Sequence, residues 1–356
     1  MAGRINLDDP EVLARYDAGG MLQRIKEMPW QCQQAWQMAM DFALPEGYAG
    51  VDKVLVLGMG GSAIGGDLVS SLLASEAWLP VMVSRGYDLP AFVDAGTLVI
   101  VSSYSGNTEE TLSSFEQAMG KGARMLAVTT GGRVKEMAEK NRVPVFSFDY
   151  KAQPRAALGF SFLPVLCFLQ RLGFLSDRSA EVAETVSVLQ KLSQRLGETA
   201  PQDVNPAKGL AQRLHGKLPV IYGAGFTGEA AHRWKTQINE NSKAWAFYEV
   251  FPELNHNAVV GFQFPAELAG GMRVVMLRSP LLSKRIRLRY EVTCQLLERA
   301  GIGYESVDGE GDSPLSQMMS LILFGDYTSY YLALLYRIDP SPVAAIDYLK
   351  QQLAKG

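Results

Sequence analysis

The chain has 356 residues, with 34 Lys and Arg side chains against 37 Asp and Glu and a formal charge of −3 at pH 7. This length predicts about two domains, and a 47% hydrophobic fraction with 20% charged residues argues against long disordered regions. The near-neutral charge balance lacks the basic excess of proteins that bind duplex nucleic acid, so no nucleic-acid partner is expected.

Cysteine spacing and apolar runs exclude two further classes. Cys32, Cys167 and Cys294 lie far apart with no CxxC pair, so we expect buried thiols and neither a disulfide framework nor a zinc site. The N-terminal residues show no apolar core of a signal peptide. The longest apolar stretch, 158–169, is shorter than the roughly 20 residues that span a bilayer. A cytoplasmic protein with no membrane partner is therefore expected.

The first part of the chain predicts a helical lead-in and then alternating strands and helices. Helical character at 10–43 assigns residues 1–45 to the lead-in. Helices are expected from Ser62 to Leu73 and from Thr108 to Met119. Short apolar runs predict strands at 54–57, 80–83, 97–101 and 125–128. Such alternation predicts a parallel sheet with helices on both faces.

The second part repeats this pattern. After a helical stretch to about Arg195 and a linker at 197–206, a strand at 219–222 runs into a second glycine-containing loop. The strand at 272–277 and the helix that ends near Arg299 repeat the pattern of 98–120. Helical character is also expected at 326–334.

These elements predict an α/β fold class with two three-layer αβα domains, each built on a doubly wound, mainly parallel sheet. The first domain is assigned to residues 46–200 and the second to 206–338. A final helix is expected within 339–356.

The glycine-rich loop at 58–66 joins the first predicted strand to a helix. Glycines let a backbone approach an anion, and a helix N-terminus favours negative charge. The loop alone leaves three interpretations open: a sugar-phosphate site, a dinucleotide site or a structural turn. A dinucleotide site requires an acidic residue about 20 residues on; Val83, Ser84 and Arg85 stand there, although Arg85 would suit an NADP phosphate.

A second loop, SSYSGNT at 102–108, follows another apolar strand and opens another helix. Ser103, Ser105 and Thr108 supply hydroxyl donors beside helix N–H groups, an arrangement that suits a phosphate monoester. The competing interpretation is helix capping by Ser105 or Thr108. With the first loop, the predicted phosphate ligands are Gly61, Ser62, Ser103, Ser105 and Thr108.

Four motifs together resemble a known family. GMGGSAIGGD at 58–67 and SYSGNTEET at 103–111 resemble the sugar isomerase (SIS) superfamily. NENSK at 239–243 and PELNHN at 252–257 resemble its bifunctional phosphoglucose/phosphomannose isomerase family, in that family's order. The resemblance covers about residues 50 to 350. It implies an aldose-ketose isomerase of carbohydrate metabolism, acting in glycolysis and gluconeogenesis, that interconverts glucose 6-phosphate and mannose 6-phosphate with fructose 6-phosphate through a cis-enediol(ate).

The resemblance also implies residue roles. Glu240 matches the base that moves a proton between C1 and C2, although by itself it indicates a solvated position after a helix. His256 would open the sugar ring, donated by the neighbouring subunit of a homodimer, and an imidazole exchanges protons near neutral pH. Arg155 would stabilise the enediolate. The C-terminal helix within 339–356 would return to the active site and place Lys350 near the ring oxygen.

Other positions are less decided. The family commonly has Glu after Asn-His-Asn, where this chain has Ala258, and Val343 is compatible with room for mannose at C2. His215 and His232 are expected to be structural or on the surface. No metal-ligand spacing is present, so neither metal nor cofactor is expected.

Two other functions compete with the isomerase. A sugar-phosphate sensor without catalysis would keep the phosphate loops but would not need Glu240, His256 and Lys350 together. An NADP-dependent dehydrogenase would use residues 58–63 and Arg85.

Overall fold

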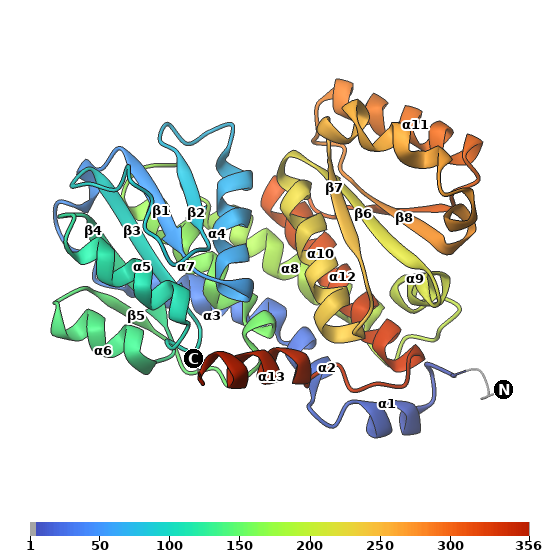
Figure 1. The fold of residues 1–356 in the computed structure, drawn as a ribbon, viewed down its shortest axis with the longest axis horizontal. Helices are drawn as coiled ribbons and strands as arrows, with labels where there is room; N and C mark the ends of the chain where they lie inside the picture. Colours follow the sequence, from blue (N-terminus) through green and yellow to red (C-terminus); the bar gives the residue numbers. More distant parts are fainter. Residues whose placement is uncertain (1–4, 356) are drawn as a thin grey trace. The chain divides into compact units, whose positions relative to one another are not determined.

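The computed structural model describes residues 5–355, so Gly356 and the first four residues of the predicted lead-in lie outside the described part. Two sheets form, and every strand pairing in them is parallel (Figure 1). The expected α/β fold class with two doubly wound sheets is confirmed.

The lead-in consists of three short helices. They are α1 (Pro10–Tyr16), α2 (Met21–Lys26) and α3 (Met28–Asp41). The break between α1 and α2 is stabilised by Asp17, whose carboxylate accepts hydrogen bonds from the N–H groups of Met21 (2.7 Å) and Leu22 (3.0 Å). A 3₁₀ turn, η1 (Tyr48–Gly50), leads into the first strand.

The first sheet has five strands in the order β2-β1-β3-β4-β5. The strands are β1 (Lys53–Leu57), β2 (Val81–Ser84), β3 (Thr97–Ser103), β4 (Arg124–Thr129) and β5 (Val145–Ser147). Four of them match the predicted apolar runs. The fifth was not predicted, because three residues are too few to carry a period.

Helices cover both faces of this sheet. They are α4 (Gly60–Leu73), α5 (Glu109–Met119), α6 (Gly132–Lys140) and α7 (Leu158–Arg171), with the 3₁₀ turn η2 (Pro154–Ala156) before α7. Leu55 and Leu57 face α5 and α6 in one core cluster, whereas Val56 faces Gly66 of α4 on the other side. Alternate residues of one strand therefore line two helical layers.

The second sheet has four strands in the order β7-β6-β8-β9. They are β6 (Leu218–Ala224), β7 (Phe247–Phe251), β8 (Met272–Arg278) and β9 (Tyr304–Asp308). The surrounding helices are α8 (Ser179–Leu196), α9 (Pro206–Leu214), α10 (Gly228–Ser242) and α11 (Lys284–Arg299). Short 3₁₀ turns connect them: η3 (Gly225–Thr227), η4 (Glu253–His256), η5 (Ala258–Gln263) and η6 (Ala266–Gly271).

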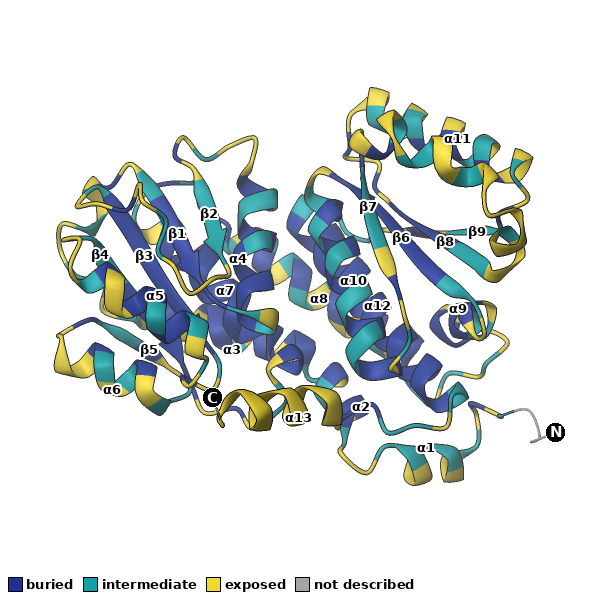
Figure 2. Cartoon of the chain, viewed as in Figure 1, coloured by how far each residue is buried: buried dark blue, intermediate teal, exposed yellow. Residues whose placement is uncertain are grey.

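Two helices end the chain. The first, α12 (Pro314–Leu335), is long and apolar enough by composition to cross a membrane, but every residue of its most apolar stretch is buried, which is the environment of a core helix. It begins 12 residues before the predicted 326–334 stretch. The second, α13 (Ala344–Leu353), is exposed along its described length (Figure 2).

The cysteines are free thiols. Cys32 and Cys167 are buried as expected, and burial raises the pKa of the Cys32 thiol to about 12. Cys294 is only partly buried. A thiol with a pKa that high stays protonated, so Cys32 is a packing residue.

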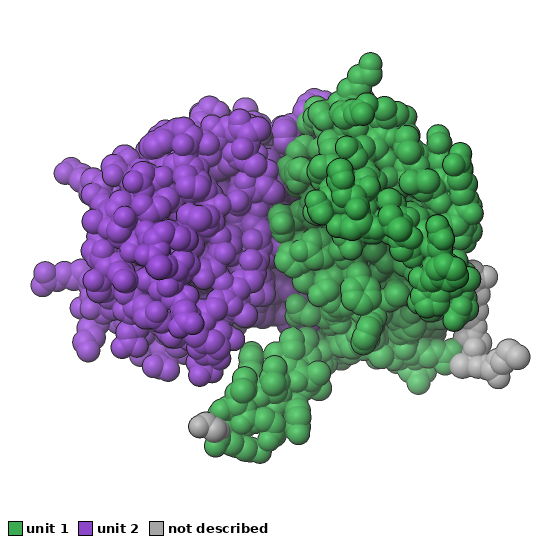
Figure 3. Space-filling model, turned by 45° about the horizontal axis from the view of Figure 1, so that its top comes forward, with its two compact units in different colours: residues 1–26, 191–309, 320–356 green, residues 27–190, 310–319 purple. Residues whose placement is uncertain are grey.

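Two compact units group these elements (Figure 3). One contains Glu27–Gln190 and Glu310–Met319, and with them the first sheet. The other contains Met1–Lys26, Lys191–Gly309 and Ser320–Gly356, and with them the second sheet. These units are groups of residues in mutual contact, and the domain boundaries expected from the sequence stay predictions.

Candidate active site

The two predicted phosphate loops meet at the carboxyl edge of the first sheet. They follow β1 and β3, which are hydrogen-bonded neighbours, and the ends of parallel strands are where α/β proteins bind ligands. The buried Ser62 hydroxyl accepts a hydrogen bond from the N–H of Tyr104 at 3.0 Å, which joins the two loops. Ser103 and Thr108 share a hydrogen bond between their hydroxyls at 3.1 Å.

The helix N-termini behind these loops have no side-chain caps. Met59 stands at the N-cap of α4 and Thr108 at that of α5, and neither side chain makes a capping hydrogen bond. Ser105 accepts from the Asn107 N–H at 3.2 Å, ahead of the helix. The first two N–H groups of each helix therefore remain available for an anion, whereas that of Ser62 donates to the carbonyl of Met59 at 3.0 Å. The capping interpretation of Thr108 is wrong.

Two glycines fix the shape of the loops. A Cβ on Gly61 would lie 2.9 Å from the carbonyl oxygen of Pro154, so the first loop packs directly on the turn that carries Arg155. Gly106 has a φ of 68°, and a Cβ there would overlap the carbonyl oxygen of Gly131. Only glycine satisfies both requirements at Gly106.

Arg155 lies on η2 and is 3% exposed, in contrast to the usual exposed arginine. The structure therefore brings Arg155 together with Gly61 and Ser62 in one unit. Arg85, the residue suited to an NADP phosphate, forms an ion pair with Asp67 of α4. A guanidinium already paired with a carboxylate is poorly placed to select an NADP phosphate.

Glu240 lies in the last turn of α10, so its expected position after the helix is wrong. Lys243 ends this helix in the left-handed region, with a φ of 51°. Its Nζ donates to the carbonyl oxygens of Glu240 (2.7 Å) and Pro340 (2.8 Å). The lysine of the NENSK motif thus satisfies carbonyls at the helix end and ties them to the chain that leads into α13.

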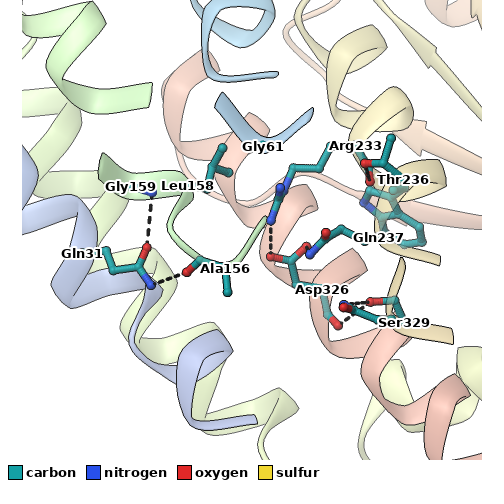
Figure 4. A network of polar contacts seen from close by, with 12 residues as sticks. Gln31, Gly61, Ala156, Leu158, Gly159, Arg233, Thr236, Gln237, Asp326 and Ser329 are labelled. Carbon is teal, nitrogen blue, oxygen red and sulfur yellow. Dashed lines mark hydrogen bonds and ion pairs between the residues drawn. The ribbon is translucent and has the colours of Figure 1, made fainter. Parts of the chain in front are cut away.

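A buried polar network holds α10 against α12 (Figure 4). The carboxylate of Asp326 on α12 accepts from Arg233 and from Gln237, each at 2.9 Å. One turn further, Asn241 donates to the hydroxyl of Ser329 at 3.0 Å. The network fixes the helix on which Glu240 stands. It was not predicted, because its partners lie about 90 residues apart in sequence.

His256 is exposed at the end of η4, and both neighbours are anchored. Asn255 donates to Thr293 of α11 at 2.9 Å, and Asn257 donates to the Glu253 carboxylate at 2.9 Å. Ala258 packs at the edge of the core of the second sheet. The chain around His256 is thus held although the imidazole itself is exposed.

The remaining histidines have structural contacts. His215 packs against Tyr336, with 4.7 Å between ring centroids. His232 contacts the Glu229 carboxylate at 3.0 Å and stacks on Tyr248.

Lys350 lies midway along α13 and is exposed, and Val343 occupies the N-cap position of that helix. Glu240, His256 and Lys350 therefore come from three separate elements of the unit that contains the second sheet. Their catalytic roles stay predictions. The phosphate loops and Arg155 form a tighter group in the other unit.

The chain is similar to known proteins over most of its length. A family model of the bacterial phospho-glucose isomerase C-terminal SIS domain matches residues 203–353. The bifunctional phosphoglucose/phosphomannose isomerase of Caldicellulosiruptor bescii is 44% identical over 336 residues, which cover 94% of this chain and 99% of that protein. The protein of the same name from Aquifex aeolicus is 36% identical over 85% of this chain and 90% of its own length.

A solved structure shares the fold. A hypothetical protein from Thermus thermophilus superposes with a TM-score of 0.73 at 16% identity, covering 97% of this chain and 92% of its own.

Proposed function

The chain belongs to the bifunctional phosphoglucose/phosphomannose isomerase family, and from this we propose that it interconverts fructose 6-phosphate with glucose 6-phosphate and with mannose 6-phosphate. The observation that carries the proposal is the 44% identity to a relative of that name along nearly both whole chains. A sensor without catalysis is not favoured, because these relatives are named as enzymes.

In the proposed reaction, Glu240 removes a proton from one of the carbons C1 and C2 and returns it to the other. The intermediate is a cis-enediol(ate), and no electron leaves the substrate, so the step needs no redox partner. His256 would move a proton between the ring oxygen and O1, with Lys350 near the ring oxygen. Arg155 would hold the negative charge that develops on the enediolate oxygens.

Phosphate binding is proposed for the loops after β1 and β3. Gly61 and the hydroxyls of Ser62, Ser103, Ser105 and Thr108 lie beside two helix N-termini that have no side-chain caps. Such N–H groups and the helix dipole favour a phosphate dianion. The phosphate would thus be held at one end of the substrate while proton transfer occurs at the other.

Use of both epimers requires room at C2 and no second base, because glucose 6-phosphate and mannose 6-phosphate give the same enediol. Val343, the half-buried residue that precedes α13, is the proposed source of that room.

A homodimer is proposed in which His256 works on the substrate of the neighbouring subunit. The exposed position of His256 on an anchored turn supports this. Mixing His256→Ala with Glu240→Gln protein should restore part of the activity through hybrid dimers. Absence of recovery despite demonstrated subunit exchange would contradict the shared site.

The cellular location and the metabolic pathway are also proposals. Phosphorylated hexoses are intermediates of glycolysis and gluconeogenesis, so we propose a cytoplasmic enzyme of these pathways with no nucleic-acid or membrane partner.

The decisive experiment is conversion of fructose 6-phosphate in buffer containing a chelator, with glucose 6-phosphate and mannose 6-phosphate followed separately by NMR. Formation of both products is expected. Formation of glucose 6-phosphate alone would contradict the proposed activity on mannose 6-phosphate and would support the proposed phosphoglucose isomerase activity. Formation of neither, with a fructose 6-phosphate-dependent rise in Tm, would favour the sensor.

A further inference from the structure

The segment that carries Arg155 has little regular structure of its own. Residues 151–153 belong to no helix or strand, and η2 is a single 3₁₀ turn of three residues. A turn this short does not fix the direction of a long side chain, so neighbouring contacts must hold it. We call residues 150–159 the arginine segment.

Tyr104 of the second phosphate loop contacts one side of the arginine segment. Its hydroxyl donates to the carbonyl of Tyr150 and accepts from the N–H of Ala152 at 2.8 Å. Its N–H donates to Ser62 of the first loop at 3.0 Å. Its carbonyl accepts from the N–H and the hydroxyl of Thr130, at 3.1 and 2.7 Å. Tyr104 therefore joins both phosphate loops to the arginine segment.

Gln31 of α3 contacts the other side. It is fully buried, and its Nε2 donates to the carbonyl of Ala156 and to the hydroxyl of Tyr150, both at 2.9 Å. Its Oε1 accepts from the N–H of Gly159 at 3.3 Å. Figure 4 shows the bonds of Gln31 to Ala156, the last residue of η2, and to Gly159 in the first turn of α7. A Cβ on Gly159 would lie 2.6 Å from the Gln31 Cβ, so the two helices meet closely here.

Gln31 carries a buried side-chain amide, and burying an amide costs free energy of folding unless its hydrogen bonds are made. An apolar side chain at position 31 would pack without that requirement. All of these hydrogen bonds of Gln31 go to the arginine segment. The hydroxyl of Tyr104 likewise bonds only backbone groups of that segment among the described residues.

We propose that Tyr104 and Gln31 are positioning residues that hold the backbone around Arg155 at a fixed position relative to the phosphate loops. The inference rests on the proposed function, in which Arg155 meets the enediolate. A misplacement of about 1 Å in such a group can cost roughly 100-fold in rate. Loss of either contact should therefore slow the chemical step and leave phosphate binding intact.

Tyr104→Phe is the first test, because it removes the hydroxyl and keeps the ring and the backbone N–H. We expect kcat for fructose 6-phosphate to fall about 10-fold. The unreactive sugar phosphate sorbitol 6-phosphate should bind with unchanged affinity and one site per chain in calorimetry. That stoichiometry excludes a loss of folded protein as the cause.

Tyr48→Phe is the matched control. The Tyr48 hydroxyl also donates to a backbone carbonyl, that of Met125 at 3.1 Å, but Met125 lies near the start of β4, away from the carboxyl edge. This control should keep the wild-type kcat. A Tyr104→Phe protein with the kcat of the control, or with a lower kcat matched by a lower site number, would overturn the role of Tyr104.

Gln31→Met tests the other side with a side chain of similar length. Gln117→Met is its control, because Gln117 also bonds backbone groups: the N–H of Leu89 and the carbonyls of Tyr87 and Ser113. A fall in kcat of about 10-fold is expected for Gln31→Met only. If that variant fails to fold, Tyr104→Phe alone decides the proposal.

The wild-type protein separates this inference from the proposed function. Without isomerase activity in the wild type, the proposed function fails and Arg155 has no reaction to assist. If the wild type is active and the Tyr104→Phe and Gln31→Met variants keep the wild-type kcat, only the positioning role of Tyr104 and Gln31 is contradicted.

Discussion

The loops at the carboxyl edges of the two sheets occupy matching places but use their polar groups differently. In the first sheet, Met59 and Thr108 leave the N-termini of α4 and α5 without side-chain caps. In the second sheet, Ser283 caps α11 by accepting from the N–H of Ile286 at 3.3 Å. The N-terminus of α5 is therefore open to an anion where that of α11 is capped, whereas α10, like α4, has no side-chain cap.

Thr227 shows the same contrast. It is fully buried, accepts from the N–H of Ala224 at 2.9 Å and donates to the carbonyl of Ala224 (3.0 Å) or Leu277 (3.2 Å). Its hydroxyl holds the loop after β6 to the end of β8. Among the described residues, Ser62 and Ser105 of the first pair of loops only accept hydrogen bonds, so their hydroxyl protons can be donated to the proposed phosphate.

The largest effect is expected at Glu240, for which we propose proton transfer and no phosphate contact. Glu240→Gln should lower kcat about 10²–10⁴-fold and leave the affinity for sorbitol 6-phosphate unchanged. Steady-state kinetics and calorimetry measure the two quantities. Glu291→Gln, an exposed glutamate on α11, is the control. Retention of more than a tenth of the rate would contradict the assignment.

The second prediction tests whether the buried polar network beside the second sheet stabilises the fold. Asp326→Ala leaves Arg233, which is 1% exposed, without the carboxylate that accepts its hydrogen bond, and should lower the free energy of unfolding by about 3–5 kcal/mol. Asp308→Ala removes an exposed pair with Arg278 and should cost less than about 1 kcal/mol. Urea unfolding measures both, and equal losses would refute the contrast.

Substituting one threonine in each pair of loops compares their roles in phosphate binding and in stability directly. Thr108→Ala should raise the KM for fructose 6-phosphate roughly 10-fold, because a hydrogen bond to a charged phosphate is lost. Thr227→Ala should keep the KM but destabilise the protein by about 1–3 kcal/mol, because buried backbone groups lose their partner. A KM effect at Thr227 would show that the second pair of loops also binds phosphate.

The smallest effect is expected at the cap of α11. Ser283→Ala should lower the free energy of unfolding by about 1 kcal/mol, the usual value of an N-cap. Its KM should stay at the wild-type value. Ser306→Ala, at an exposed serine of β9, should change neither. A larger KM for Ser283→Ala would mean that the N-terminus of α11 takes part in binding.

Much of the fold could be predicted, because the central strands are continuous apolar runs. The runs at 54–57, 97–101, 219–222 and 272–277 became β1, β3, β6 and β8. The edge strands β7 and β9 were missed, since FYEVF and YESVD are interrupted by acidic residues and are mostly only partly buried. The start of α12 was also missed, because a helix buried on every side shows no amphipathic period.

The site was predictable where it is contiguous in sequence. The phosphate loops are each about ten residues long, so their hydroxyls and glycines could be recognised together. Gln31 and Ala156 are 125 residues apart, and a glutamine within a helix indicates a solvated face until the fold is known. Lys243 was assigned to a motif, but its bonds to the carbonyls of Glu240 and Pro340 depend on a left-handed helix end.

Both compact units are completed late in synthesis. The unit that contains the first sheet takes Glu310–Met319 from a point beyond every strand of the second sheet, and Glu184 accepts from the N–H of Asp312 there. At about 5–20 residues per second, translation from Gln190 to Met319 takes on the order of ten seconds. The chain therefore cannot finish one unit before starting the other, and during that interval the unit that contains the first sheet lacks its last ten residues, Glu310–Met319.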